Sequence, residues 1–310
     1  MGGGRLALAA AAGLLLAAAL LFFASSPPPP PAAPPLAPTP QTEHRPLLVL
    51  GHGTGRIVSA AQDYLLFVAY LEARLPVRCR IRIVPDGAEY QRRIASGEID
   101  LAYLAPFEFV EARERAGAVP IVMPTTLAGS QTYRGIVMTN RPEIQTLSDL
   151  RSRRVTFVDD QSASGYLFPL ALLYEKGIDP VRDFASFEPS GSHENVVLNV
   201  LSGRFDAGFT LEDGNISEES ARLRKNVRTI ATTASIPPGM LAFSRVFVRD
   251  HPALADSVRK VLEGMSRDEA GRAAFSKIFR GATGIKRPRV SDFDGVVRVR
   301  DTLRRRGVAL

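Results

Sequence analysis

Two short polar segments contain the residues of this sequence whose types could bind an anion. The first, residues 159–165, reads Asp-Asp-Gln-Ser-Ala-Ser-Gly and lies between a predicted strand and a predicted helix. Ser162 and Ser164 are of the type that caps helix N-termini, and Gly165 lets a ligand approach the backbone closely. A helix N-terminus has unpaired amide hydrogens and roughly half a unit of positive charge, which favours phosphate-like anions. An ordinary serine cap has the same pattern, so this segment alone leaves both interpretations open.

The second segment, residues 190–194, follows another predicted strand and contains Ser192 and His193 immediately before a helix. An imidazole can donate a hydrogen bond to an oxyanion, and a charged ring makes that bond stronger. A single histidine near a helix start is more often a local cap, so its significance depends on its lying beside the first segment. Three residues occupy equivalent positions in the first half of the chain: His52, Thr54 and Tyr103.

Other kinds of chemistry find little support in the sequence. The glycine-rich segment that begins at Gly51 has Arg56 where a dinucleotide-binding motif needs its last glycine. No serine lies in a G-x-S-x-G motif, and His193 has no evident carboxylate partner beyond Glu194. Cys79 is the only cysteine and the four histidines are far apart, so no intramolecular disulfide and no local zinc motif is possible. We therefore predict no catalytic residue, no metal site and no cofactor.

The composition is that of a folded protein with a basic surface. Of 310 residues, 45% are hydrophobic and 23% are charged, and the net charge is +7. The excess comes from arginines that are scattered along the chain and more frequent in residues 280–306. Most of these are expected to be solvated, with some attraction to anionic lipid or an acidic partner. The absence of an aromatic-rich basic motif argues against nucleic acid as a partner.

The N-terminal residues have the composition of an export segment and a linker. Residues 6–24 form an apolar run of about 19 residues, long for a signal peptide and just long enough to span a bilayer. We therefore interpret residues 1–26 as a signal peptide or an uncleaved N-terminal membrane anchor, two alternatives that remain open. Residues 27–46 are rich in proline and predict a stiff linker.

An internal repeat indicates the architecture. Residues 96–103 match residues 202–209 at an offset of 106, and in each copy a helix ends at a glycine before a short strand. The same offset aligns the strand at residues 47–50 with the strand at residues 154–158. Each half thus reads strand, helix, strand, helix, strand, which predicts an α/β fold with two lobes, each an open, mostly parallel sheet.

The repeat also predicts how the chain is divided. Lobe 1 would comprise residues 47–130 and 233–310, and lobe 2 residues 131–232. A chain that crosses twice between lobes forms a two-strand hinge, which permits rigid-body closure around a ligand. Three helices are predicted in the C-terminal part: residues 253–264, 268–279 and 294–306.

Several pieces of sequence together carry a resemblance to a known family. They are residues 96–103 with Ala105-Pro106, residues 162–169, residues 191–194 leading into residues 202–206, and Ile236-Pro237-Pro238-Gly239. Across about residues 47–306 the chain resembles the phosphate, phosphite and phosphonate (PhnD-like) substrate-binding proteins of ABC transporters. The resemblance implies the type II periplasmic binding-protein fold. It departs from the family at Asp160, a carboxylate in place of the usual proline, which would repel a dianion if it faced the site.

From the residues and the resemblance we predict a function and a site. The protein would be an extracytoplasmic solute-binding protein, periplasmic or anchored to the inner membrane, and not an enzyme. It would capture a phosphonate-, phosphite- or phosphate-class oxyanion in an interlobe cleft and deliver it to the permease of an ABC transporter. The alternative is a membrane-tethered sensor or accessory module that signals to a partner such as a sensor kinase. The predicted ligand-binding residues are Ser162, Ser164, Gly165, Tyr166, Ser192, His193, Tyr103, His52 and Thr54.

Overall fold

The computed structural model describes residues 46–53, 57–126, 132–212, 222, 224–279 and 282–308. Residues 1–44 form one unit and residues 45–310 another. The predicted export segment, nearly all of the linker and Thr54 lie outside the described residues. Among the residues that are described, no helix has both the length and the apolar character needed to cross a bilayer.

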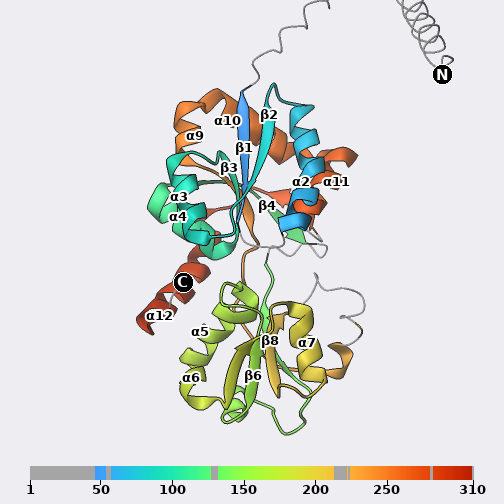
Figure 1. The fold of residues 1–310 in the computed structure, drawn as a ribbon, viewed down its shortest axis with the longest axis vertical. Coiled ribbons are helices and arrows are strands. Elements are labelled where there is room, and N and C mark those ends of the chain that lie inside the picture. The colour runs from blue at the N-terminus through green and yellow to red at the C-terminus, as the bar shows by residue number, and fades with distance from the viewer. Residues whose placement is uncertain are drawn as a thin grey trace, which may run out of the picture. The chain divides into compact units, whose positions relative to one another are not determined.

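The first sheet has six strands in the order β11-β4-β10-β3-β1-β2 (Figure 1). Their bounds are β1 Leu47–His52, β2 Arg78–Ile83, β3 Leu101–Leu104, β4 Val119–Thr126, β10 Met240–Phe243 and β11 Ala282–Lys286. Strand β1 pairs in parallel with β2 and β3, whereas β10 is antiparallel to β3 and β4, and β11 is antiparallel to β4. The helices of this part are α2 Ile57–Glu72, α3 Gly87–Ser96, α4 Pro106–Ala116, α9 Arg245–Asp250, α10 Pro252–Gly264 and α11 Glu269–Ile278.

The second sheet has five strands in the order β7-β6-β8-β5-β9. Their bounds are β5 Gly135–Thr139, β6 Arg154–Phe157, β7 Ser186–Pro189, β8 Ala207–Leu211 and β9 Arg228–Thr232. Strand β6 is parallel to β7 and β8, and β5 is antiparallel to β8 and β9. The helices are α5 Phe168–Glu175, α6 Pro180–Asp183 and α7 His193–Leu201.

The predicted α/β fold with two open sheets is confirmed, with one difference. Each repeat forms a parallel three-stranded unit, β2-β1-β3 in one half and β7-β6-β8 in the other. The glycines that end the two repeat helices, Gly97 and Gly203, have φ of 79° and 75°, the left-handed conformation that the sequence predicted. The difference is that β5 and β10 join the parallel units in the antiparallel direction, so both sheets are mixed.

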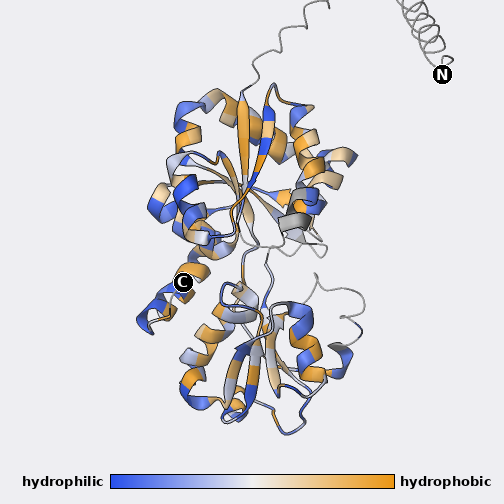
Figure 2. Ribbon diagram, viewed as in Figure 1, coloured by the Kyte–Doolittle hydropathy of each residue, from blue (hydrophilic) through white to orange (hydrophobic). Residues whose placement is uncertain are grey.

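Apolar residues on both faces of the first sheet form its core. One cluster, which includes Leu50, Phe67 and Phe275, contains side chains of β1, α2 and α11. A separate cluster, which includes Tyr90 and Phe109, contains side chains of α3 and α4. Figure 2 shows a mostly hydrophobic β1, with helices in which hydrophobic and hydrophilic residues alternate along the ribbon. This is the pattern of a sheet covered by amphipathic helices.

Two crossing segments connect the sheets and pair with each other. The amide of Tyr133 donates to the carbonyl of Ile236 at 3.0 Å, and the amide of Ile236 donates back at 2.8 Å. Beside them, the amide of Thr233 donates to the carbonyl of Gly135 at 2.9 Å, and the amide of Gly135 donates to Thr233 Oγ1 at 2.9 Å. This short ladder lies where the sequence predicted the hinge, and its role as a hinge stays a prediction.

The C-terminal helix α12 (Asp294–Arg305) contacts helices of both parts. On one side the ring of Phe293, just before α12, packs against Phe109 of α4 at 4.7 Å between ring centres. On the other side Leu303 shares an apolar cluster with Leu167 and Leu170, which lie in the turn before α5 and in α5. The predicted division assigned this helix to the first lobe, but its packing is shared.

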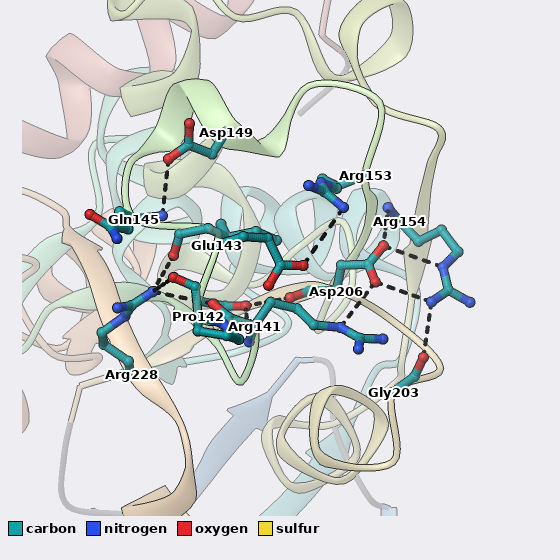
Figure 3. A network of polar contacts seen from close by, with 12 residues as sticks. Arg141, Pro142, Glu143, Gln145, Asp149, Arg153, Arg154, Gly203, Asp206 and Arg228 are labelled. Carbon is teal, nitrogen blue, oxygen red and sulfur yellow. Dashed lines mark hydrogen bonds and ion pairs between the residues drawn. The ribbon is translucent and has the colours of Figure 1, made fainter.

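The repeated aspartate has the same structural role in both halves. Asp100 Oδ2 accepts the amide hydrogen of Val49 at 2.7 Å, and Asp206 Oδ2 accepts that of Arg154 at 3.0 Å. Each carboxylate thus ties the start of its strand to the neighbouring parallel strand. Asp206 also accepts a bond from Arg154 Nη2 at 3.1 Å, within the polar network of Figure 3. Although burial opposes its ionisation, the bonds from Arg154 hold the pKa of Asp206 below the ordinary value.

We expect the substitution Asp206→Asn to lower the free energy of unfolding at neutral pH by about 1–3 kcal/mol, because a bond to a charged group is lost in a largely buried place. Because the pKa of Asp206 is depressed in the fold, its contribution is present above the unfolded value of 3.8 and is lost as pH falls through the folded value. Urea unfolding at neutral and acidic pH measures both effects, and the two proteins should converge in acid.

The matched control is Glu143→Gln, which removes a carboxylate from the same network. Glu143 is exposed and lies 3.9 Å from Arg153 Nη1, so its loss should change stability by less than about 1 kcal/mol. If both variants lost the same free energy of unfolding, the assigned role of Asp206 would be contradicted.

Candidate functional site

The serine segment forms the start of a helix after β6. Ser162 is the N-cap of a π-helical turn, Ala163–Leu167, that continues into α5. Its Oγ accepts the amide hydrogen of Gly165 at 3.1 Å, so these two predicted site residues are partly satisfied by each other. For the amides of Ala163 and Ser164, and for the Ser164 hydroxyl, no acceptor is found among the residues that the structure describes. These donors are the ones that remain for a ligand.

Close packing holds this serine turn in place. A Cβ atom on Gly165 would come within 2.3 Å of Val158 Cγ2, so glycine is needed here for packing. A Cβ atom on Gly135, at the start of β5, would come within 2.4 Å of the carbonyl oxygen of Ser164. The sequence had suggested that Gly165 serves the approach of a ligand, whereas the structure gives it a packing role as well. The turn is therefore fixed between the end of β6 and the start of β5.

The histidine segment forms the start of α7. Ser192 is the N-cap, and its Oγ accepts the amide hydrogen of Asn195 at 3.1 Å. Nδ1 of His193 lies 2.9 Å from Thr210 Oγ1 and accepts the amide hydrogen of Leu211 at 3.3 Å. Because a backbone N–H can only donate, this network assigns Nδ1 as the acceptor and places the hydrogen of the neutral ring on Nε2. The ring is thus fixed in orientation and has a donor on its other nitrogen.

The two segments meet at the same end of the second sheet. Gly135 of β5 and Leu211 of β8 are directly opposite each other in the antiparallel pair. The Ser164 carbonyl lies against Gly135, and the amide of Leu211 bonds to His193 Nδ1. Because both segments contact this one residue pair, the serine turn and the histidine lie at the same place in the second sheet.

Tyr166 lies in a different environment. Its ring packs against Phe157 at 4.6 Å and Phe187 at 5.8 Å between ring centres, within the apolar cluster of the second sheet. Burial raises the pKa of its hydroxyl. The structure therefore does not bring Tyr166 together with His193, and its role in binding stays a prediction.

In the first sheet, His52 and Tyr103 occupy matching positions at the ends of β1 and β3. They are partners in the parallel register, and their ring centres are 5.2 Å apart. His52 Nδ1 also lies 3.3 Å from the hydroxyl of Tyr64. Burial lowers the pKa of His52 and raises the pKa of Tyr103 to about 12, so at neutral pH both groups are uncharged and Tyr103 keeps its hydroxyl hydrogen.

Two residues that support the site were not predicted. Thr210 fixes His193, and it is fully buried in an otherwise apolar strand, a pattern that could have been noticed in the sequence. Gly239 supports Tyr103, because a Cβ atom there would come within 2.5 Å of the tyrosine hydroxyl. Only the fold shows this second contact. Among the described residues no group of three or more potential ligands could hold a metal ion.

We expect the imidazole of His193, in its neutral form, to be the Nε2–H tautomer in the protein without ligand. The amide of Leu211 can only donate to Nδ1, which excludes a hydrogen there. Nitrogen-15 NMR of the histidine rings measures the tautomer directly. A protonated Nδ1 in the neutral ring would show that this network is wrong, and Thr210→Val, which removes one of the two contacts to Nδ1, should increase the population of the other tautomer.

Comparison with protein families gives a match over most of the chain. A family model described as "ABC transporter, phosphonate, periplasmic substrate-binding protein" matches residues 58–293. The phosphate-import protein PhnD of Mycolicibacterium smegmatis is 32% identical over 139 residues, which are 41% of this chain and 43% of that protein. The match therefore spans less than half of the length of this curated relative.

Comparison with solved structures gives matches over about four fifths of the chain. XAC2383 from Xanthomonas citri, bound to ATP, has a TM-score of 0.70 at 23% identity, and the match covers 83% of this chain and 99% of that one. PhnD1 from Prochlorococcus marinus, in complex with methylphosphonate, has a TM-score of 0.68 at 17% identity, with 83% and 98% covered. At these identities the similarity concerns the fold.

Proposed function

The chain belongs to the family of periplasmic substrate-binding proteins of phosphonate ABC transporters, and from this premise we propose that it binds a small phosphonate-, phosphite- or phosphate-class oxyanion between its two sheets. The resemblance drawn from the sequence is thereby confirmed, as is the type II periplasmic binding-protein fold. The family consists of solute-binding proteins and not of enzymes.

The observation that carries this proposal is the set of unpaired donors in the serine turn. Ser164 is only 3% exposed, yet no acceptor for its hydroxyl or its amide is found among the described residues. These donors lie at the start of a helix, where an anion can supply the acceptor that the protein does not. In this proposal Nε2 of His193, a residue held at the same Gly135–Leu211 pair, donates to the same anion.

The strength of such a site depends on contributions from both sheets. Hydrogen bonds to a charged group contribute roughly 1.5–3 kcal/mol each, whereas micromolar affinity needs about 8 kcal/mol. Three or four bonds from the serine turn and the histidine reach this value only before ordering costs are subtracted. We therefore assign Tyr103 and His52 to the opposite side of the ligand, where an uncharged ring and a hydroxyl add donors. In this proposal the cleft closes around the ligand by rotation about the paired crossing segments.

The other predicted roles follow from the same proposal. The partner is the permease of an ABC transporter, and the protein acts outside the cytoplasm. Gly165 donates to Ser162, so its part is to shape the turn. Ser192 has its Oγ engaged by Asn195 but keeps a hydroxyl hydrogen that can donate. The alternative of a membrane-tethered sensor depends on residues 1–45, which lie outside the described part of the chain.

We expect methylphosphonate, phosphite or phosphate to raise the melting temperature of the protein. A ligand at a hundredfold excess over its dissociation constant stabilises the native state by about 2.7 kcal/mol, which corresponds to a few degrees for a chain of this size. Thermal unfolding with each anion at matched ionic strength measures the effect. A melting curve unmoved by every anion of the panel would overturn the proposed function.

We expect Ser164→Ala to weaken binding of the anion at least about tenfold, because a charge-assisted bond is lost. Stability without ligand should be unchanged or slightly higher, because the hydroxyl has no partner to lose among the described residues. Calorimetric titration and urea unfolding measure the two quantities separately. The matched control is Ser257→Ala on α10, whose exposed hydroxyl donates to the carbonyl of Ala253, and this variant should bind normally.

His193→Ala should also weaken binding, because alanine removes the Nε2–H donor. The control is His251→Ala, at the start of α10, where the histidine ring packs on Phe247. If the His251 and His193 variants bound equally well, His193 would not be a ligand residue.

A further inference from the structure

Glu108 lies in the first turn of α4, and only one of its two carboxylate oxygens accepts a hydrogen bond from the described residues. Oε2 accepts the amide hydrogen of Ala105 at 2.7 Å, in the manner of a capping box. Oε1 lies against the end of β1, where a Cβ atom on Gly53 would come within 2.9 Å of it. The close approach of Oε1 to the backbone is possible because residue 53 is a glycine.

No cation neutralises this carboxylate within the described part of the chain, and no second donor is found there. Burial raises the pKa of Glu108, and its charge contributes to the raised pKa of Tyr103 and of Tyr90. A partly buried carboxylate without a cation is unfavourable, and the positive end of α4 offsets only part of the cost. A ligand that donated a hydrogen bond to Oε1 would offset the remaining cost of this uncompensated charge.

The first turn of α4 faces the helix that carries the serine turn. The ring of Phe107 packs against Phe168 of α5 in an edge contact, with 5.9 Å between ring centres. Ala163, the first residue of the serine turn, belongs to the same apolar cluster as Phe168 and Phe109. The first turn of α4, which contains Glu108, therefore contacts α5 through Phe107. The charge of Glu108 also acts on the hydroxyl of Tyr103.

We propose that Glu108 makes the site selective for ligands that present a hydrogen-bond donor, with Oε1 accepting a hydrogen from the ligand. The donor is either the P–OH of an oxyanion that retains one proton or an ammonium group elsewhere on the ligand. An oxyanion that has only acceptors, such as a sulfonate, would set negative charge against the carboxylate and lose affinity. This inference rests on the proposed function, because it concerns the ligand of the same site.

Capping of α4 is the other role that Glu108 can have, and one substitution separates the two. Glutamine also serves at this position of a capping box, so Glu108→Gln keeps the bond from Ala105 and removes the charge. The matched control is Glu111→Gln, one turn further along α4, where the carboxylate is paired with Arg115 at 2.7 Å on the surface. Both variants lose one negative charge from the same helix.

The experiment compares methylphosphonate with methanesulfonate by calorimetric titration, at a pH where methylphosphonate retains one proton. The two anions then have the same charge and nearly the same shape, and differ in the P–OH group. We expect the native protein and Glu111→Gln to prefer methylphosphonate, and Glu108→Gln to lose at least about tenfold of this preference, the value of one charge-assisted bond. Aminomethylphosphonate is the third probe, and an additional loss of affinity for it in Glu108→Gln would identify an ammonium group as the donor.

Each outcome bears on a different claim. If the native protein bound none of the three anions, the proposed function would fail and the selectivity with it. If the native protein bound methylphosphonate and Glu108→Gln kept the full preference over methanesulfonate, only the role of Glu108 would be overturned. An unchanged melting temperature of Glu108→Gln without ligand would verify that the cap is retained.

Discussion

The amide and hydroxyl hydrogens at the start of a helix need acceptors from outside the helix, and this requirement governs the end of the second sheet where the serine turn lies. Within the turn, Ser162 satisfies the amide of Gly165, but the donors of Ser164 are left without an acceptor among the described residues. The turn is closely packed against its neighbours, because a Cβ atom on Gly165 would clash with Val158 and a Cβ atom on Gly135 would clash with the carbonyl of Ser164. The packing of the protein therefore keeps these donors in place, and an anion is the acceptor that we propose.

Much of the fold could be predicted because the repeat encodes it locally. The glycines at positions 97 and 203 adopt the left-handed conformation that ends each repeat helix, and the aspartates at positions 100 and 206 pin each strand to its neighbour. These contacts involve residues close to the motif in sequence or at a fixed place in the repeat. The antiparallel direction of β5 and β10 could not be predicted, because a short apolar strand looks the same in either direction and only the path of the chain decides it.

The sequence indicates residue types for the candidate site but does not give their contacts. The sequence groups Tyr166 with the serines, and in the structure its ring packs on Phe157. In a helix, neighbours in sequence point to different faces, and the neighbouring elements decide which face meets the apolar cluster. The supports from Thr210 and Gly239 come from strands or loops distant in sequence, so no local pattern could connect them with His193 and Tyr103.

The charges near the site suggest how it distinguishes one small anion from another. The proposed site has three hydrogen-bond donors: the hydroxyl of Ser164, the Nε2–H of His193 and the hydroxyl of Tyr103. A site made only of donors would bind any oxyanion of suitable size. Discrimination then needs a group that penalises the wrong ligand, because specificity is a difference between two affinities. Glu108 is such a group, since its carboxylate rewards a ligand with a hydrogen to donate and repels one without. In the proposed site the donors would set how tightly an oxyanion is held, and the acceptor at Glu108 would set which oxyanion it is.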